Sequence, residues 1–257
     1  MARIHPTAIV DPGAELGENT DIGPYCVIGP HVKIGAGARL MAHVFMDGWT
    51  TLGAGCTVFP FASLGTQTQD LKYKGGASRV EIGESTTIRE YVTVNTATAD
   101  GDVTQVGSRC HIMAYAHIAH DCRVGDEVIM ANCATLAGHI LIEDQVIIGG
   151  LCGVHQFVRI GRLSIVGGCS KVTQDVPPFM MADGHPLAIH GINSVGLKRH
   201  GVSEAAQRHL KNAYRILYRE GLSTSQALER LEAEPEKSPE TAELLHFIRH
   251  SNRGIVH

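Results

Sequence analysis

The sequence predicts a mainly β fold: a parallel β-helix over residues 1–185, followed by a small α-helical domain over residues 186–257. Two observations predict it. An aliphatic residue returns every six positions over most of the chain, and this period then gives way to helical spacing. The composition agrees, because the 257 residues include 29 glycines and only 5% aromatic residues. A thin, regular interior needs little aromatic bulk, and glycine allows tight corners.

The six-residue period runs from Val10 to Val172. Of its 28 positions, 25 hold an aliphatic residue or Met, which fits short strands joined by corners into coils of three hexapeptides. The three exceptions are Asp70, Gly76 and Asp100. They fall in two places, near residues 66–79 and 97–105, where we expect loops inserted without loss of phase.

The position two residues before each aliphatic residue is usually small, and it holds five of the seven cysteines. Such a column predicts small buried side chains in the interior of the coils. No CxxC motif occurs, and the number of cysteines is odd. We therefore expect neither disulfides nor a metal site among these thiols.

Helix-capping residues mark the last segment. The period ends in QDVPPFMMADGHP, which its prolines mark as a linker. Ser203 is a suitable N-cap for a first helix, and Ser223 with Gln226 forms the capping-box pattern of a second. Ser238, followed by Pro239, opens a third. We therefore expect three helices after the linker.

Charge and hydropathy limit the partners and the location. The formal net charge is −4, which argues against nucleic acid as a partner. Residues 193–257 nevertheless carry a net charge of +2, and a basic appendage on an acidic body suits an acidic partner. No apolar run reaches the length of a membrane helix, and the N-terminal segment lacks a signal-peptide core. We expect a cytoplasmic protein without stable membrane insertion.

Eight histidines lie in the repeat region, and none of them falls in an interior column. Parallel strands lie about 4.8 Å apart, so residues 18 apart in a coil of three hexapeptides stack on one another. Position 120 then stacks on positions 138 and 156, and position 121 on position 139. The patch predicted over three coils contains His120, Asp121, Gly138, His139, His155 and Gln156.

The residue types of this patch suit acyl transfer. An imidazole titrates near pH 6.5, so its neutral form can remove a proton from an alcohol at neutral pH. A carboxylate beside the imidazole orients or polarises it. The N–H of a glycine can approach a developing oxyanion without hindrance from a side chain.

Several segments resemble a known family. The repeat itself resembles that of the hexapeptide-repeat acyltransferases, whose coils wind left-handed, so we expect a left-handed parallel β-helix. The segments AHIAHDC, LAGH, VHQF, GGCS, QDVPP, GLKRHG and QDLKYKG resemble the UDP-N-acetylglucosamine acyltransferases, and the resemblance runs nearly end to end. It implies transfer of an (R)-3-hydroxyacyl chain from acyl carrier protein to the 3-hydroxyl of UDP-N-acetylglucosamine, the first step of lipid A synthesis. It also implies a homotrimer with active sites between subunits, and no cofactor.

The resemblance implies roles for individual residues. His120 would be the general base, Asp121 would assist it, and the N–H of Gly138 would stabilise the oxyanion. Gly168 would leave room for a long acyl chain. The residues implied to bind substrate are Gln69, Asp70, Lys72, His117, His139, His155, Gln156, Asn193 and Arg199.

Four positions depart from the pattern of the family. Asn95 and Thr96 stand where many relatives have a His-Arg pair. His200 stands where relatives often carry a second Arg, and Val195 where they carry Glu. These departures bear on nucleotide binding and not on the base.

Other functions stay open at the level of sequence. The acceptor sugar could carry a 3-amino group in place of the 3-hydroxyl, and the donor could be acetyl-CoA. His117, His120 and His139 also suggest a zinc hydratase similar to the gamma-type carbonic anhydrases. A β-helix scaffold without catalysis is the alternative outside enzymes, and it predicts that His120→Ala changes nothing measurable.

Overall fold

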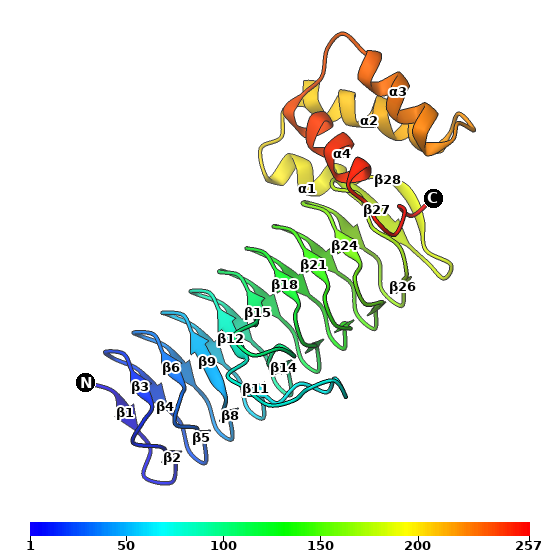
Figure 1. The fold of residues 1–257 in the computed structure, drawn as a ribbon. Helices are drawn as coiled ribbons and strands as arrows, with labels where there is room; N and C mark the ends of the chain where they lie inside the picture. The colour runs from blue at the N-terminus through cyan, green and yellow to red at the C-terminus, as the bar shows by residue number, and fades with distance from the viewer.

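A computed structural model describes residues 1–257, and it shows a rod of stacked coils with a cluster of helices at one end (Figure 1). The N-terminus lies at the far end of the rod, and the C-terminus returns beside the strands next to the helices. Most strands are only two residues long, and three sheets form the three sides of the rod, parallel throughout except for the last pair of strands in one of them. The fold is therefore the expected parallel β-helix.

We call the sheets A, B and C. Sheet A contains β1 (Arg3–Ile4), β4 (Asp21–Ile22), β7 (Arg39–Leu40), β10 (Thr57–Val58), β13 (Thr87–Ile88), β16 (His111–Ile112), β19 (Ile129–Met130), β22 (Ile147–Ile148), β25 (Ile165–Val166), β27 (Met180–Asp183) and β28 (Ala188–Ile192). Sheet B contains β2 (Ile9–Val10), β5 (Val27–Ile28), β8 (Phe45–Met46), β11 (Ser63–Thr66), β14 (Thr93–Asn95), β17 (His117–Ile118), β20 (Thr135–Leu136), β23 (Gly153–Val154) and β26 (Lys171–Val172). Sheet C contains β3 (Glu15–Leu16), β6 (Lys33–Ile34), β9 (Trp49–Leu52), β12 (Arg79–Ile82), β15 (Val103–Val106), β18 (Arg123–Val124), β21 (Leu141–Ile142) and β24 (Arg159–Ile160).

The register confirms the stacking period. Partners on neighbouring coils are 18 residues apart, as in the pairing of His117 with Thr135. Across the first inserted loop Thr57 pairs with Thr87, and across the second Thr93 pairs with His117. These separations exceed 18 by whole multiples of six, so both loops preserve the phase. The loops themselves occupy residues 67–78 and 96–102.

The interior column is buried as predicted. Its aliphatic residues are buried from Ile22 to Val172, and only Val10 and Leu16, at the open N-terminal end, stay half-buried. Five cysteines lie in the interior, whereas Cys133 is half-buried and Cys169 is exposed. All seven are free thiols.

Four helices follow the coils: α1 (Ser194–Arg199), α2 (Glu204–Tyr218), α3 (Thr224–Ala233) and α4 (Pro239–Arg249). Ser203, Ser223 and Ser238 cap α2, α3 and α4, and the capping box with Gln226 is present. The sequence missed α1, because six residues are too few to show a helical period. No helix combines the length and the apolar character needed to span a bilayer.

The prediction that QDVPPFMMADGHP is a linker is wrong in part. Strand β27 pairs in parallel with β25 and antiparallel with β28, so sheet A continues through it. The reason is burial, because Phe179, Met180 and Ala182 extend the apolar core beyond the last regular coil. The predicted division at residue 185 falls between β27 and β28. As a boundary between folding units it stays a prediction.

Candidate active site

One corner of the rod carries the predicted patch. We call the corner between sheets B and C the B–C corner; it consists of residues 119–122, 137–140 and 155–158 in three successive coils. Both inserted loops leave the rod at this corner, since each connects a strand of sheet B with one of sheet C. The period of six thus brings the histidines and the two longest insertions to one edge of the molecule.

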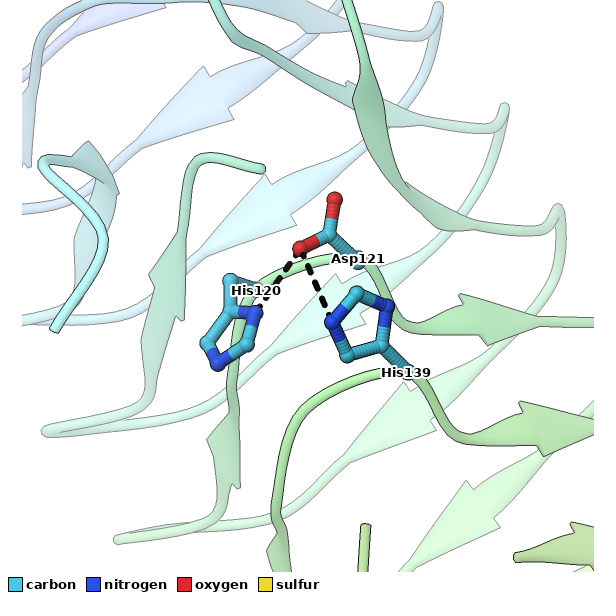
Figure 2. Close-up of side chains that lie close together, drawn as sticks. All are labelled: His120, Asp121 and His139. Carbon is cyan, nitrogen blue, oxygen red and sulfur yellow. Dashed lines mark hydrogen bonds and ion pairs between the residues drawn. The ribbon is translucent and has the colours of Figure 1, made fainter. Parts of the chain in front are cut away.

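His120, Asp121 and His139 meet at this corner (Figure 2). The Nδ1 atom of His120 lies 2.8 Å from Oδ2 of Asp121, and Nε2 of His139 lies 3.7 Å from the same oxygen. The side chains of His120 and Asp121 are 14% and 11% exposed, against 40% for His139. Because Nδ1 of His120 faces the carboxylate, its Nε2 atom stays free to accept a proton from a substrate.

The backbone places Asp121 for this contact. Asp121 has a left-handed conformation with φ of +59°, which aspartate tolerates better than most residues. Its N–H donates to Oγ1 of the fully buried Thr104 at 2.8 Å. The N–H of Thr98 donates to both carboxylate oxygens, at 3.3 and 3.4 Å. The carboxylate is therefore oriented from the backbone of its own coil and from the second inserted loop.

The position of the His120 imidazole requires a glycine at residue 138. A Cβ atom at residue 138 would lie 2.3 Å from Cε1 and 2.5 Å from Nε2 of His120, so only glycine lets the ring pack there. The N–H of Gly138 donates to no acceptor in the chain. Prolines occupy the same place of the hexapeptide in other coils: Pro6, Pro12, Pro24, Pro30 and Pro60. The fold thus leaves this N–H unused, and Gly138 itself lies beside the imidazole of His120.

Thr98 is a contact that sequence reasoning missed. Its Oγ1 lies 3.1 Å from Nδ1 of His120 and 3.4 Å from Oγ1 of Thr68 in the first loop. Oγ1 of Thr68 in turn accepts a hydrogen bond of 3.1 Å from the N–H of Asp70. A threonine in a loop gives no signal of its own. Only the three-dimensional structure shows this contact, because the path of the second loop places residue 98 beside residue 120.

His117 lies on sheet B next to the dyad of His120 and Asp121. Its Nδ1 atom is 2.7 Å from Oγ1 of Thr93. Burial lowers the pKa of His117 below its usual value, and the nearby His120 lowers it further. His117 is therefore neutral at neutral pH and offers a hydrogen bond rather than a charge.

The first inserted loop brings Asp70 near the dyad. Its Oδ1 atom accepts the N–H of Lys72 at 2.9 Å. This hydrogen bond is the main reason why the pKa of Asp70 is lowered, and the charges of His120, Lys72 and His139 lower it further. The side chains of Lys72 and Gln69 are exposed, as a role in binding substrate requires.

Asn95 and Thr96, which differ from the family pattern, form hydrogen bonds with the start of the first inserted loop. The buried amide of Asn95 donates to Oγ1 of Thr66 at 2.9 Å and to the carbonyl of Gln67 at 3.1 Å, and it accepts from Gln69 at 3.4 Å. Thr96 is also buried, and its Oγ1 accepts the N–H of Thr68 at 3.3 Å. Both residues therefore hold the first loop in place within this chain.

The remaining predicted residues of the patch lie further along the corner. His155 and Gln156 are exposed, and Nδ1 of His155 lies 3.4 Å from Nη2 of Arg253 in the C-terminal segment. His139 is stacked on Phe157 with ring centroids 4.7 Å apart. Arg253 and Phe157 were not singled out from the sequence.

The residues predicted to meet the nucleotide belong to α1. Asn193 is its N-cap and accepts the N–H of Gly196, while Nδ2 of Asn193 donates to the carbonyl of Leu163 at 2.9 Å. Both polar groups of the Asn193 side chain therefore have partners within the chain. Arg199 is exposed and makes no ion pair, and the neighbouring Val195 and His200 are exposed as well.

Gly168 lies elsewhere. It belongs to the corner between sheets A and B, the A–B corner, which consists of residues 113–116, 131–134, 149–152 and 167–170 in the upper coils. A Cβ atom at residue 168 would meet only the backbone of Gly150, with the carbonyl oxygen at 3.3 Å, and no side chain lies within 4 Å of it. Within one chain, sheet B separates Gly168 from His120.

Two family models match the chain. The model of the bacterial transferase hexapeptide, with six repeats, matches residues 104–138. The model of the second domain of UDP-N-acetylglucosamine O-acyltransferase matches residues 175–256, which contain all four helices.

Curated relatives resemble the chain over its whole length. A protein of Verminephrobacter eiseniae named acyl-[acyl-carrier-protein]–UDP-N-acetylglucosamine O-acyltransferase is 48% identical over 261 residues, covering 100% of both chains. A protein of the same name from Thermodesulfovibrio yellowstonii is 51% identical over 256 residues, covering 99% of each.

Solved structures share the fold. The structure of LpxA from Acinetobacter baumannii matches with a TM-score of 0.95 at 44% identity, covering 99% of each chain. LpxA from Bacteroides fragilis, a UDP-N-acetylglucosamine acyltransferase, matches with a TM-score of 0.94 at 39% identity over 99% of this chain and 100% of its own. Together with the hexapeptide model, these matches confirm the left-handed parallel β-helix.

Proposed function

Since the chain belongs to the UDP-N-acetylglucosamine acyltransferase family, we propose that it transfers an (R)-3-hydroxyacyl chain from acyl carrier protein to the 3-hydroxyl of UDP-N-acetylglucosamine. This reaction is the first step of lipid A synthesis, and we place it in the cytoplasm, without stable membrane insertion. The observation that carries the proposal is the dyad of His120 and Asp121 packed against Gly138, whose N–H is unused.

His120 acts as the general base. Its Nδ1–H donates to Asp121, which fixes the tautomer with a free lone pair on Nε2. Nε2 takes the proton of the 3-hydroxyl while the oxygen attacks the thioester carbonyl. Asp121 then stabilises the imidazolium that forms, in a site where both side chains are mostly shielded from water.

Gly138 stabilises the intermediate. Attack turns the carbonyl oxygen into an oxyanion, which accepts the N–H of Gly138. Collapse of the tetrahedral carbon breaks the bond to sulfur, and His120 returns its proton to the leaving thiolate. The reaction yields the acylated sugar nucleotide and the free thiol of the carrier protein. It needs no covalent acyl-enzyme and no cofactor.

The substrate residues divide between the loops and the helices. Asp70 and Lys72, with Gln69 nearby, would hold the sugar from the first loop. His117, His139, His155 and Gln156 would line the sugar and the thioester along the corner. Asn193 and Arg199 would meet the diphosphate, Arg199 through charge-assisted hydrogen bonds.

We infer that the site is shared between copies of the chain in a homotrimer. Gly168 and His120 lie on different corners of one chain with sheet B between them, whereas a second copy could present its Gly168 to the site at His120. Sheet A adds support, because Ile129, Ile147 and Ile165 form a half-buried apolar row that ends at the exposed Met181. Such a row on the face of a β-helix suits burial against a second copy.

The basic helices suit the carrier protein. Lys198, Arg199, Arg208 and Lys211 make no ion pair within the chain, although most other basic residues of the helices do. They lie on α1 and on the first half of α2. An acidic carrier protein would find unpaired positive charges there, which favours a carrier-protein thioester over a CoA thioester as donor.

The decisive test is a transfer assay with a series of 3-hydroxyacyl carrier proteins, from ten to sixteen carbons, and UDP-N-acetylglucosamine. We expect product, with one preferred chain length. Parallel reactions offer acetyl-CoA as donor or the 3-amino sugar nucleotide as acceptor. Faster transfer to the amino sugar would replace the acceptor in the proposal, and activity with acetyl-CoA alone would contradict it.

A further inference from the structure

The side chains of His120, Asp121 and His139 turn atoms that can bind a metal toward one another. Figure 2 shows one nitrogen of His120 and one of His139 facing the same oxygen of Asp121. The ligand atoms of the three residues all lie within 4.8 Å of one another. Two imidazoles and a carboxylate are a common ligand set for Zn²⁺ and related divalent metals.

The distances suit a tetrahedral ion. Zn²⁺ with bonds of about 2.0–2.2 Å holds its ligand atoms roughly 3.3–3.6 Å apart. The observed separations from Asp121 are 2.8 Å to His120 and 3.7 Å to His139, which lie on either side of this range. The two imidazole nitrogens lie within 4.8 Å of each other, so rotation of the side chains can bring all three ligand atoms to such separations.

The backbone holds the ligands at this spacing. His120 and His139 belong to neighbouring coils, and the N–H of His139 donates to the carbonyl of His120 at 3.0 Å. Residues 121 and 139 both have left-handed backbone conformations, with φ of +59° each. A ligand set on a rigid corner loses little conformational entropy when it binds an ion.

The surroundings favour a cation. Asp70 of the first loop is close enough for both His120 and His139 to act on its charge. Its carboxylate therefore adds negative potential to this part of the site. Lys72 is exposed and makes no ion pair.

We propose that this cluster, His120, Asp121 and His139, binds Zn²⁺ or a similar divalent transition metal, and that binding switches the acyltransferase off. This differs from a metal hydratase, because the metal is an inhibitor and not a cofactor. The inhibitory half rests on the proposed function, whereas the binding half does not.

The inhibition follows from the tautomer of His120. In the active form the proton is on Nδ1 and the lone pair on Nε2. A metal ion bound at Nδ1 needs the lone pair of that atom, so the single proton of the neutral ring moves to Nε2. His120 then has no lone pair to accept the proton of the acceptor hydroxyl. The metal also takes the carboxylate that would stabilise the imidazolium.

Binding is tested first, without substrate. Titration calorimetry with Zn²⁺ on the wild-type chain should give one site per chain that depends on the cluster. Asp121→Asn and His139→Gln should each weaken this binding at least about tenfold. Asn is chosen because it tolerates the left-handed backbone of residue 121. Co²⁺ should show the visible absorption of a four-coordinate ion in the wild type and lose it in both variants.

The matched control is a second histidine pair. His246 and His250 on α4 have ring centroids 4.1 Å apart and are the competing place for a metal. His246→Gln should leave both the affinity and the cobalt spectrum unchanged. Loss of binding in His246→Gln but not in Asp121→Asn would overturn the proposal, and so would a wild-type chain without specific binding.

The inhibitory half is tested in the transfer assay. Zn²⁺ should abolish transfer at the concentrations that saturate the site, and excess chelator should restore it. Binding at the cluster with unchanged transfer would overturn this half. A chain that binds Zn²⁺ but transfers no acyl group in the absence of metal would instead contradict the proposed function, and the binding site would stand.

Discussion

The A–B and B–C corners share a backbone but differ in chemistry. The A–B corner continues through the lower coils at residues 23–26, 41–44, 59–62 and 89–92. From there on each A–B corner contains one residue with a left-handed conformation, and so does each of the three B–C corners that carry the patch. On the A–B corner these residues form a ladder of stacked rings, with centroids 4.8–5.0 Å apart: Tyr25, His43, Phe61, Tyr91 and Tyr115. On the B–C corner the same slot holds Asp121, His139 and Phe157.

The two corners differ in how far the residue at this left-handed position is covered by other parts of the chain. Tyr115 on the A–B corner is 59% exposed, while the side chain of Asp121, in the same coil, is only 11% exposed. The inserted loops leave from the B–C corner alone, and Thr98 of the second loop contacts the dyad. The repeat therefore supplies the positions, and the loops supply the shielding that strengthens electrostatic interactions at one corner.

The largest difference in kcat is expected between alanine variants of two histidines, one on each corner. His120→Ala should lower kcat by about 10² to 10³, because it removes the proposed general base. His43→Ala, on the A–B corner, should leave kcat within about twofold of wild type. Transfer assays on both purified variants give the comparison, with circular dichroism as the check on folding. Equal losses would mean that the two corners do not differ in function.

A smaller loss is expected from one added methyl group. Gly138→Ala places a Cβ atom 2.3 Å from Cε1 of His120, so the imidazole must move away from its position. We expect kcat to fall by roughly 10 to 10². Gly153→Ala is the control, since nothing lies within 4 Å of the added atom. Unchanged kcat in Gly138→Ala would show that the packing of His120 on residue 138 does not matter for transfer.

Thr98 tests the contribution of the second loop. Thr98→Val removes the hydroxyl beside Nδ1 of His120 but keeps the N–H that reaches Asp121. We expect a loss of about tenfold in kcat, with most of the activity regained in Thr98→Ser. Thr86→Val removes a buried hydroxyl on another corner and should lower stability without changing kcat. The same loss in Thr98→Val and Thr98→Ser would rule out a role for the hydroxyl.

The ladder of the A–B corner should contribute to stability only. Tyr91 is stacked between Phe61 and Tyr115, at 5.0 and 4.8 Å. Tyr91→Ala removes two stacked pairs, so the free energy of unfolding should fall by roughly 1–3 kcal/mol. Denaturant unfolding measures the loss, and kcat at a temperature where the variant is folded should match wild type. A drop in kcat there would mean that the ring ladder also serves catalysis.

The smallest expected effect is on the way the free energy of unfolding depends on pH. Burial lowers the pKa of His117 in the folded chain, so as the pH falls the unfolded chain takes up this proton first. The stability that comes from the neutral ring is present above pH 6.5 and is lost as the pH falls through the folded pKa. Unfolding free energies at about pH 7.5 and about pH 5 should therefore differ less in His117→Gln than in wild type. An equal or larger difference in the variant would contradict this assignment.

Much of the architecture could be predicted because the period of six is an arithmetic constraint. It correctly gave the interior column, the stacking of residue 121 on residue 139, and the phase of both loops. It could not give the strand β27 or the helix α1, since both lie where the period has ended and are too short to show another.

The site was predictable where it lies on the repeat and not where it lies on the loops. His120, Asp121 and Gly138 occupy repeat positions, so their proximity follows from counting residues. Thr98 and Asn95 act through hydrogen bonds whose partners are set by the path of two irregular segments. The predicted roles of the substrate residues remain to be measured.

We propose that the B–C corner of one chain and the A–B corner of another together form one acyltransferase site. A mixture of two inactive variants tests this arrangement. His120→Ala and Gly168→Phe are each expected to be inactive with a long acyl donor, although Gly168→Phe should still use a short one. Assemblies formed by refolding the two together should regain roughly a quarter of the wild-type activity, from interfaces that combine an intact His120 with an intact Gly168. Activity no higher than that of the separate variants would contradict the shared site.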